Sequence, residues 1–326
     1  MSTKIARRNI TPRNKKWGTR PPPPAPCPKP PSSSTTTVMV PGECPPAAPC
    51  EYPHPVFVPR ALLTAWNVAM TLFHVALATT TLALGTLDLT VPVYRTVLTV
   101  NQTRTPPLLL PELVRDRVDL PLTAFVAAFF AITAIAHLLN ATLLRGFYFR
   151  ELGRCRTPLR WVEYSFSAPL MMTLIGYLMG LRDRAVLFSV GALVASTMPY
   201  GLWVEMISRP LTPRTWTLPL HVRLFPWLLG HVPQTAAWIV VILQLYDGAA
   251  DSDLIPWFVY VILWTQLALF YSFGLATVVS QCMPPDRFYR GELLFQFLSL
   301  ASKGLLGGLL IANVLMRSRY EDAFDG

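Results

Sequence analysis

Seven long apolar stretches, separated by shorter polar segments, dominate the residue pattern after about residue 60. A helix needs about 20 predominantly apolar residues to cross the hydrocarbon core of a bilayer. Backbone polar groups in lipid must be satisfied within the structure, so these stretches are expected to be helices; barrel strands would be short and alternating. The pattern predicts an all-α membrane protein, a seven-transmembrane helix bundle, with spans at about 61–85, 120–144, 155–180, 185–207, 226–247, 255–281 and 292–316.

The segment between the first two spans, 86–119, has a different period. Apolar and polar residues alternate in TLDLTVPVYRTVLTV, most clearly from Leu87 to Val93, and this alternation is typical of a β-strand. We therefore predict a short β-hairpin in this first loop, outside the membrane. The loop also contains the sequon NQT at Asn101, which is a candidate glycosylation site.

The N-terminal segment, residues 1–59, differs in composition from the rest. It is basic, and 15 of the 32 prolines lie between Pro21 and Pro59. Such a stretch has no core and is expected to be disordered or extended, partly as polyproline II. The predicted organisation is a cytosolic tail at 1–59, a membrane domain at 60–317 and a short extracytosolic tail at 318–326.

Arginine and lysine near the span ends predict the orientation of the bundle. Nine of them lie between residues 1 and 60, and the second and fourth loops are also basic, whereas the fifth loop is acidic. By the positive-inside rule, this multi-pass membrane protein has a cytosolic N-terminus and an extracytosolic C-terminus. The formal net charge of +10 reflects the same bias and fits attraction to anionic lipid. No nucleic-acid partner is expected, because the basic residues do not interleave with aromatic ones.

Composition and motif spacing limit the class of protein further. With 52% hydrophobic and 14% charged residues, the chain is too apolar for an ordinary soluble domain. Three of its five cysteines lie in the N-terminal segment, so no disulfide framework is expected. Neither a nucleophile–base pair nor metal-ligand spacing such as HxxxH or HExxH occurs. We expect neither an enzyme nor a metal site.

A single lysine, Lys303, lies near the middle of the last apolar stretch, and no other lysine follows Lys29. A lone charge in hydrocarbon costs at least ~2.5 kcal/mol and marks a functional site by default. Such an amine either pairs with a carboxylate as an ammonium or stays neutral and nucleophilic towards an aldehyde. Ser299, one helical turn earlier, lies on the same face and can bond to its nitrogen. A protonated Schiff base there would need a counter-ion.

The candidate counter-ions are Glu163 in the third span and Glu205 near the end of the fourth. Glu163 shares a helix face with Arg160 and Ser167, so it can instead be an interfacial partner that neutralises Arg160. Pairing Glu163 with the deeper Lys303 requires the third span to begin nearer residue 150. It also predicts a wet cavity on the cytosolic side lined by Arg154, Arg156 and Arg160.

Two histidines lie at comparable depth in the first two spans, His74 and His137. Each alone can be a hydrogen bonder between packed helices. Together with Glu163, Glu205 and Lys303, they are typical of an interior that handles protons.

Four motifs occur at separate places in the spans: W-N-x6-H (Trp66, Asn67, His74), RWVEYSFS (160–167), G-x-x-x-E (Gly201 to Glu205) and S-x-x-x-K (Ser299 to Lys303). Together they resemble the heliorhodopsins, retinal proteins whose membrane orientation is inverted relative to type-1 microbial rhodopsins, and the resemblance covers roughly residues 60–316.

The resemblance implies that Lys303 forms a Schiff base with all-trans retinal, which isomerises to 13-cis. It implies that Glu163 is the counter-ion, that Ser299 bonds to the base, and that His74 and His137 belong to the polar cluster that receives its proton. It also implies a homodimer with an extracellular hairpin.

Aromatic residues are expected around the polyene: Trp264, Phe270 and Tyr271 from the sixth span and Trp238 from the fifth. Ser167 is also placed in the chromophore site. The chain departs from the family pattern with Pro199 in the fourth span and with Tyr271.

The function that these features indicate is retinal photoreception, with a signalling partner that the sequence does not identify. A passive light-gated proton path through Glu205, Glu163 and the histidines is the alternative output. A pump is disfavoured, because the outer part of the third span, APLMMTLIGYLMG, has no carboxylate. An alternative from a different functional class is a non-retinal seven-helix transporter with Lys303 and Glu163 paired in its substrate site.

Overall fold

The computed structural model describes residues 58–101, 103, 106–208, 219–250 and 255–317 of the 326-residue chain. Most of the predicted cytosolic tail, residues 1–57, and the predicted C-terminal tail, 318–326, lie outside the described residues. Within the described part, seven helices have 20 or more residues. They are α1 (Arg60–Leu84), α2 (Leu122–Ala141), α4 (Pro158–Leu178), α5 (Arg184–Ser208), α6 (Leu220–Ala250), α7 (Trp257–Cys282) and α8 (Phe288–Leu310).

Most helix limits agree with the apolar stretches to within a few residues. The exception is α6, which begins at Leu220 rather than near 226 and keeps Pro226 and Pro233 inside the helix. Among the described residues, six helices are long and apolar enough to cross a membrane. The remaining long helix, α4, carries Arg160 and Glu163 close to its start.

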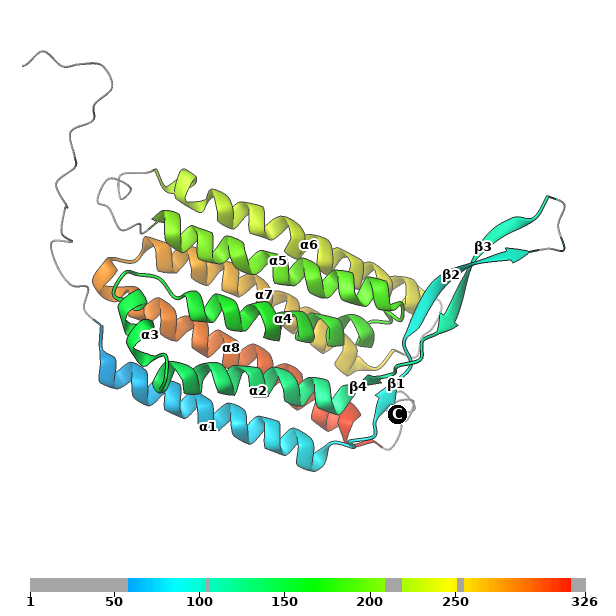
Figure 1. Ribbon diagram of the computed structural model, residues 1–326, viewed down its shortest axis with the longest axis horizontal. Coiled ribbons are helices and arrows are strands. Elements are labelled where there is room, and N and C mark those ends of the chain that lie inside the picture. The colour runs from blue at the N-terminus through cyan, green and yellow to red at the C-terminus, as the bar shows by residue number, and fades with distance from the viewer. Residues whose placement is uncertain (1–57, 102, 104–105, 209–218, 251–254, 318–326) are drawn as a thin grey trace, which may run out of the picture. The chain divides into compact units, whose positions relative to one another are not determined.

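The seven long helices lie side by side and follow one another around the bundle (Figure 1). Each contacts the next in chain order, and α8 returns to contact α1. Helices α1, α4, α6 and α8 all begin at the same end, which we call the Arg60 end. The opposite end, where α1 leads into the strands, we call the strand end.

Four strands occupy the segment between α1 and α2. The long pair is β2 (Tyr94–Asn101) and β3 (Leu108–Arg115), which run antiparallel with Tyr94 opposite Arg115. The short pair, β1 (Thr90–Val91) and β4 (Leu120–Pro121), joins their bases. The backbone N–H of Tyr94 donates to the carbonyl of Arg182 at 2.9 Å, so the strands are attached to the turn between α4 and α5.

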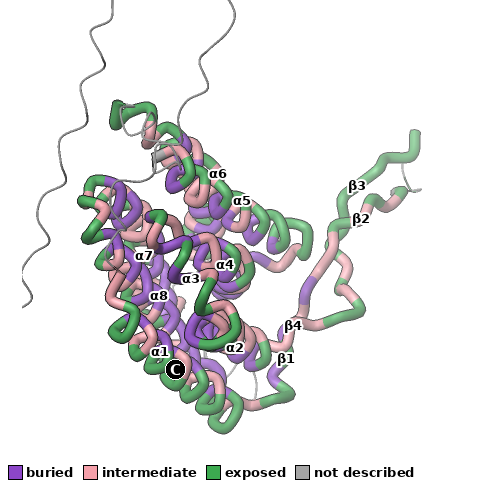
Figure 2. Tube along the Cα trace, turned by 60° about the vertical axis from the view of Figure 1, so that its left-hand side comes forward, coloured by how far each residue is buried: buried purple, intermediate pink, exposed green. Residues whose placement is uncertain are grey.

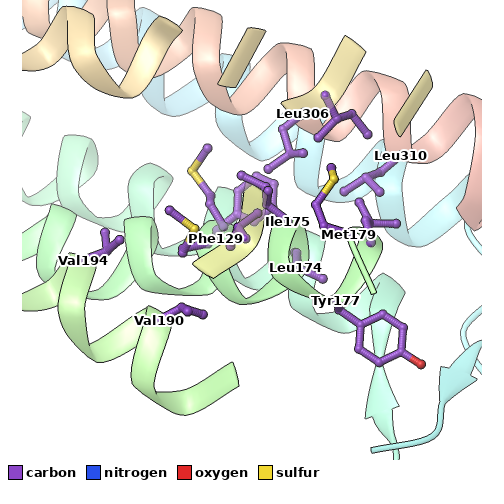
Figure 3. Packing of buried hydrophobic residues seen from close by; sticks show 14 of the residues in the cluster. Phe129, Leu174, Ile175, Tyr177, Met179, Val190, Val194, Leu306 and Leu310 are labelled. Carbon is purple, nitrogen blue, oxygen red and sulfur yellow. The ribbon is translucent and has the colours of Figure 1, made fainter. Parts of the chain in front are cut away.

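Buried residues lie on the helix faces that point towards one another, and exposed residues lie on the outer faces (Figure 2). The outer faces are themselves apolar: Leu72, Phe166 and Phe188 are all more than half exposed. A bundle that is apolar on both sides suits a lipid surround. Within the bundle, large apolar side chains fill the half towards the strand end (Figure 3); they include Phe129, Leu174, Ile175, Val190, Val194, Leu306 and Leu310.

The short helix α3 (Arg145–Leu152) covers the Arg60 end. Its Tyr148, Phe149 and Leu152 form a second apolar cluster with Leu63 of α1 and Phe288 of α8. The connection between α2 and α4 is therefore packed onto the bundle.

Candidate functional site

Lys303 lies inside the bundle, on the face of α8 that points towards α4, and is 3% exposed. Its Nζ donates to Oε1 of Glu163 at 2.9 Å and to Oγ of Ser299 at 2.8 Å. Ser299 is in reach because residues four apart stack on one helix face. The ring of Tyr164 also faces the ammonium, with Nζ 5.1 Å from its centroid. The buried positive charge is thus paired with a carboxylate and bonded to a hydroxyl.

Glu163 is held by a third helix as well. The hydroxyl of Thr133 on α2 donates to the same Oε1 at 2.5 Å. The sequence analysis missed Thr133, although it lies one turn before His137 on the same helix face. The carboxylate therefore ties α2, α4 and α8 together at one point.

The prediction that α4 must begin near residue 150 for this pair to form is wrong. Helix α4 begins at Pro158, and the pair forms nevertheless. Because α3 occupies the Arg60 end beside Phe288, α4 starts deeper in the bundle than α8 does. The Lys303 side chain also points back towards the start of its own helix, as helical side chains do, and so approaches Glu163.

Arg160 does not neutralise Glu163. It forms ion pairs with Glu205 of α5 and, at 2.6 Å, with Glu292 of α8, and all three side chains are buried. Glu205 also accepts from the backbone N–H of Thr157 at 2.7 Å. Besides the two candidate counter-ions Glu163 and Glu205, the bundle therefore buries a third acid, Glu292. The sequence did not single out Glu292, although Glu292, Gln296, Ser299 and Lys303 share a helix face by their spacing.

The two histidines come together between α1 and α2. Their rings stack with centroids 5.7 Å apart. Nδ1 of His137 bonds to Oδ1 of Asn67 at 2.8 Å, and Nδ1 of His74 donates to the carbonyl of Met70 at 2.8 Å. Nε2 of His74 is buried and has no hydrogen-bond partner among the described residues. The pair therefore keeps one unused ring nitrogen inside the bundle.

A small polar cavity of about 20 Å³ lies between His137, Glu163 and Arg160. His137, Arg160, Glu163, Glu292 and Gln296 are among its lining residues. It is large enough for about one water molecule. The prediction of an arginine-lined cavity is wrong in its lining, because Arg160 borders it while Arg154 and Arg156 do not. Arg154 instead pairs with Glu151 of α3 at 2.9 Å.

A larger cavity extends from Lys303 across the bundle to α6. It encloses about 770 Å³ of space free of protein atoms, part of it open to the exterior, and about 90 Å³ of this is reachable by the centre of a water molecule. Three glycines line it, and at one of them, Gly201, a Cβ would collide with the ring of Trp161, which packs directly on the glycine. Aromatic rings that line the cavity are Trp161, Tyr164, Tyr200, Trp227, Phe270, Phe273 and Phe295.

Of the four aromatic residues predicted around the ligand, Phe270 alone lines this cavity. The prediction for Trp264 is wrong, because it is 49% exposed on the outside of the bundle. Trp238 is buried behind Phe270, with ring centroids 5.4 Å apart, and the hydroxyl of Tyr271 pairs with Thr235 at 2.7 Å. A helical span is aromatic on several faces, so its sequence did not show which face is inward. Ser167 is buried and lines the cavity, as the sequence places it.

Gln266 of α7 is another residue that the sequence analysis missed. Its amide Nε2 donates to the carbonyl of Ser302 at 3.0 Å, and its Oε1 accepts from the Ser302 hydroxyl at 2.8 Å. Gln266 is fully buried. These two bonds join α7 to the residue directly before Lys303 and help to fix the position of the lysine.

Two solved rhodopsin structures are similar to the chain over 78% of its length. The thermophilic rhodopsin from Rubrobacter xylanophilus is 16% identical, with a TM-score of 0.48 and 93% of its own chain covered. The light-driven proton pump LR (Mac) from Leptosphaeria maculans is 10% identical, with a TM-score of 0.38 and 88% covered. At such low scores and identities, neither likeness supports a conclusion about function. None of the curated proteins matches the chain.

The sequence model of one family does match. The heliorhodopsin model covers residues 63–315, a range that is most of the chain and includes every site residue described above. Lys303, Glu163, Ser299 and the two histidines all lie within it, in the mutual contacts just described. The chain therefore belongs to the heliorhodopsin family, whose members are transmembrane retinal proteins and photoreceptors.

Proposed function

We propose that the chain is a photoreceptor that binds all-trans retinal through Lys303, with Glu163 as the counter-ion. The single observation that carries this proposal is the position of Lys303. Its buried amine is held between Glu163 and Ser299 and lines a large cavity rich in aromatic residues. A retinal bound there supplies the absorption of visible light and an aldehyde that condenses with the amine.

The residues present fit such a group in two respects. Apart from the end near Lys303, the cavity lining is mainly apolar and aromatic, which suits a polyene. Glycines at 201, 230 and 274 line it where helices approach closely; at Gly230 a Cβ would come within 3.0 Å of Tyr200. The glycines therefore let the rings of Trp161, Tyr200 and His231 pack closely against the neighbouring helices around the cavity.

The protein's own groups control the proton at Nζ of Lys303. The Glu163 carboxylate balances a positive charge at that nitrogen, and the Ser299 hydroxyl oxygen accepts its second hydrogen bond. A proton leaving Nζ has the Glu163 carboxylate, at 2.9 Å, as its nearest basic group. From there the small cavity leads to His137 and to the Arg160 cluster with Glu205 and Glu292. Loss of the charge at Nζ would alter the field on these groups, a local electrostatic switch inside a packed bundle.

The proposed orientation places the Arg60 end in the cytosol and the strand end outside. The excess of arginine and lysine before α1 and in the second and fourth loops supports it. In this orientation the β2–β3 pair is extracytosolic, and Asn101 at the end of β2 is topologically available for glycosylation. The homodimer that the family implies stays a prediction.

One observation keeps gated proton conduction as a second candidate output. The connected polar groups run from Lys303 through Glu163 to Glu205, which is most of a relay on the Arg60 side. The half towards the strand end is filled by apolar side chains, and this favours a sensor. Voltage-clamp recording of illuminated cells that express the chain separates the two outputs. A photocurrent that reverses at the proton equilibrium potential removes the sensor-only reading.

The experiment that tests retinal binding is an absorption spectrum of the purified full chain after addition of all-trans retinal. We expect a visible band in the wild type and none in Lys303→Ala. Ser299→Ala is the matched control, because it removes a partner of the amine without removing the amine, and it should keep a band, shifted in position. Colour in Lys303→Ala would overturn the proposal. A colourless wild type would favour the transporter reading, with Lys303 and Glu163 as a plain ion pair.

A further inference from the structure

The large cavity has a second polar end that the proposed attachment at Lys303 does not use. Its lining on α6 consists of Trp227, Gly230, His231 and Gln234. Helix α6 lies two positions around the bundle from α8, with α7 between them. Axes of packed helices are about 8–10 Å apart, so these residues lie across the bundle from Lys303. In a mainly apolar pocket, a few placed polar groups determine which ligand binds.

His231 is held with one nitrogen available to the cavity. Its Nδ1 bonds to the carbonyl of Trp227 at 2.8 Å, and because a carbonyl only accepts, Nδ1 carries the proton. Nε2 of the neutral ring is then an acceptor, and it has no hydrogen-bond partner among the described residues. A Cβ on Gly274 would lie only 2.6 Å from this Nε2. Only a glycine at this position of α7 leaves room for the imidazole in this orientation.

Neighbouring groups hold the imidazole in place. The His231 ring packs on the Trp227 ring with centroids 4.3 Å apart, and the Tyr271 ring lies 5.9 Å away. The indole N–H of Trp227 in turn donates to the carbonyl of Gly274 at 2.8 Å, which fixes α6 against α7. The acceptor is therefore preorganised, so a ligand group that meets it loses little free energy in ordering the site.

Gln234, one turn after His231, adds a donor at the same end. Its side chain lines the cavity, and its amide forms no hydrogen bond to another described residue. An amide presents both a donor and an acceptor, whereas the free nitrogen of His231 only accepts. A ligand hydroxyl is the group that meets both demands, since it donates to the imidazole and accepts from the amide.

We propose that the cavity takes a retinal whose ring carries a hydroxyl group, with His231 as the acceptor of the hydroxyl proton and Gln234 as its donor. This inference rests on the proposed attachment at Lys303. With the aldehyde end held by α8, the ring end of the ligand lies against α6. A plain hydrocarbon ring leaves both polar groups without a partner, which carries a free-energy cost when the ligand excludes water from them.

A competition between two retinals tests the proposal. The purified full chain is incubated with equal amounts of all-trans retinal and either 3-hydroxy or 4-hydroxy all-trans retinal, and the bound fraction is extracted and separated by chromatography. We expect one of the hydroxylated retinals to be preferred about fivefold, as for one net hydrogen bond. Equal binding of all three by the wild type overturns the proposal without any variant.

Variants assign the preference to residues. His231→Phe keeps an aromatic ring but removes the acceptor, and it should reduce the preference to about one. Tyr271→Phe is the matched control, because its hydroxyl pairs with Thr235 rather than lining the cavity, and it should keep the preference. Comparing ratios between variants cancels any difference in detergent partitioning. A preference that survives His231→Phe overturns the assignment to His231. A wild type that stays colourless with each of the three retinals refutes the attachment at Lys303 instead.

Discussion

The two halves of the bundle on either side of Lys303 are stabilised by different interactions: ion pairs and hydrogen bonds in one, apolar packing in the other. Towards the Arg60 end, buried charges and hydroxyls bond to one another, with Arg160 between Glu205 and Glu292 and with Tyr148 donating to Glu292 at 3.3 Å. Towards the strand end, the packed side chains are mainly Leu, Ile, Val, Met and Phe, with Tyr177 at the edge (Figure 3), where its hydroxyl donates to the carbonyl of Pro92. Lys303 and Glu163 lie at the boundary.

This difference determines what a change of charge at Lys303 can do in each direction. On the Arg60 side, several charged and polar side chains are buried in a low dielectric, so the change is felt as electrostatic energy. On the strand side, the described residues of the apolar cluster include no Asp, Glu, His, Lys or Arg, and the change acts mainly by moving packed side chains. The site therefore has an electrostatic output at one end and a mechanical one at the other.

The largest expected effect comes from breaking the polar half at Arg160. Arg160→Met removes the cation shared by two buried carboxylates and leaves Glu205 and Glu292 unpaired. Removing one partner of a buried ion pair typically costs about 3–5 kcal/mol. We expect a loss of that size in the free energy of unfolding, measured by denaturant titration in detergent with tryptophan fluorescence.

Two further variants check that charge is the cause. Adding Glu205→Gln and Glu292→Gln to Arg160→Met should restore much of the loss, because no unpaired charge remains. Arg184→Met breaks an ion pair to Asp116 at 2.7 Å at the exposed start of α5, where water screens it, and should change stability little. An Arg160→Met protein as stable as the wild type would show that the polar half is not held by its charges.

The apolar half should respond to lost volume rather than lost charge. Leu306→Ala opens a cavity within the buried apolar cluster that also contains Phe129, Ile175 and Leu310. In soluble proteins this change costs about 2–5 kcal/mol as lost transfer energy plus a cavity term. In lipid the transfer part shrinks, because helices there associate through packing rather than burial from water. We expect about 2 kcal/mol in the same unfolding titration.

Leu305 is the matched control for Leu306. It is the preceding residue of the same helix, but it is 38% exposed on the outer side, whereas Leu306 is fully buried. Leu305→Ala should cost less than about 1 kcal/mol, since lipid fills the space that the side chain leaves. Equal losses from the two variants would mean that the strand half is not tightly packed.

The bundle itself was accessible from the sequence because each span must carry a continuous apolar run. Hydropathy located the helices to within a few residues, and helical spacing paired Ser299 with Lys303. The predicted partnership of Lys303 with Glu163 required chemical reasoning, since a buried cation needs an anion. In these cases local pattern and elementary electrostatics were sufficient.

Other features depend on how helices rotate and shift against one another, which one sequence does not record. The depth of α4 depends on α3 filling the Arg60 end, and a short polar-looking helix gave no sign of that role. Trp264 was placed inward because the sequence of α7 is apolar on all sides. Glu292 could have been found, because it lies eleven residues before Lys303, a spacing that returns to the same helix face.

The smallest expected effect lies at the strand end, where Asp183 attaches β2 to the turn before α5. Its Oδ2 accepts from the hydroxyl of Thr96 at 2.7 Å and from the Thr96 backbone N–H at 2.9 Å. The hydrogen bond from the Thr96 hydroxyl, with further help from backbone N–H groups, lowers the pKa of Asp183 below its usual value.

A lowered pKa means that the attachment is fully present above the ordinary aspartate pKa and is lost as the pH falls through the lowered one. We expect the Thr96 amide to exchange its hydrogen slowly near neutral pH. At a pH below the ordinary aspartate pKa, that protection should shrink beyond the intrinsic change in exchange rate. Asp183→Asn should show weak protection at both pH values, whereas Asp116→Asn, an acid of the same region that pairs with Arg184, should behave as the wild type. Because the site is exposed, Asp183→Asn should hardly change the free energy of unfolding of the whole bundle. A large change in that free energy would show that the strands stabilise the helices.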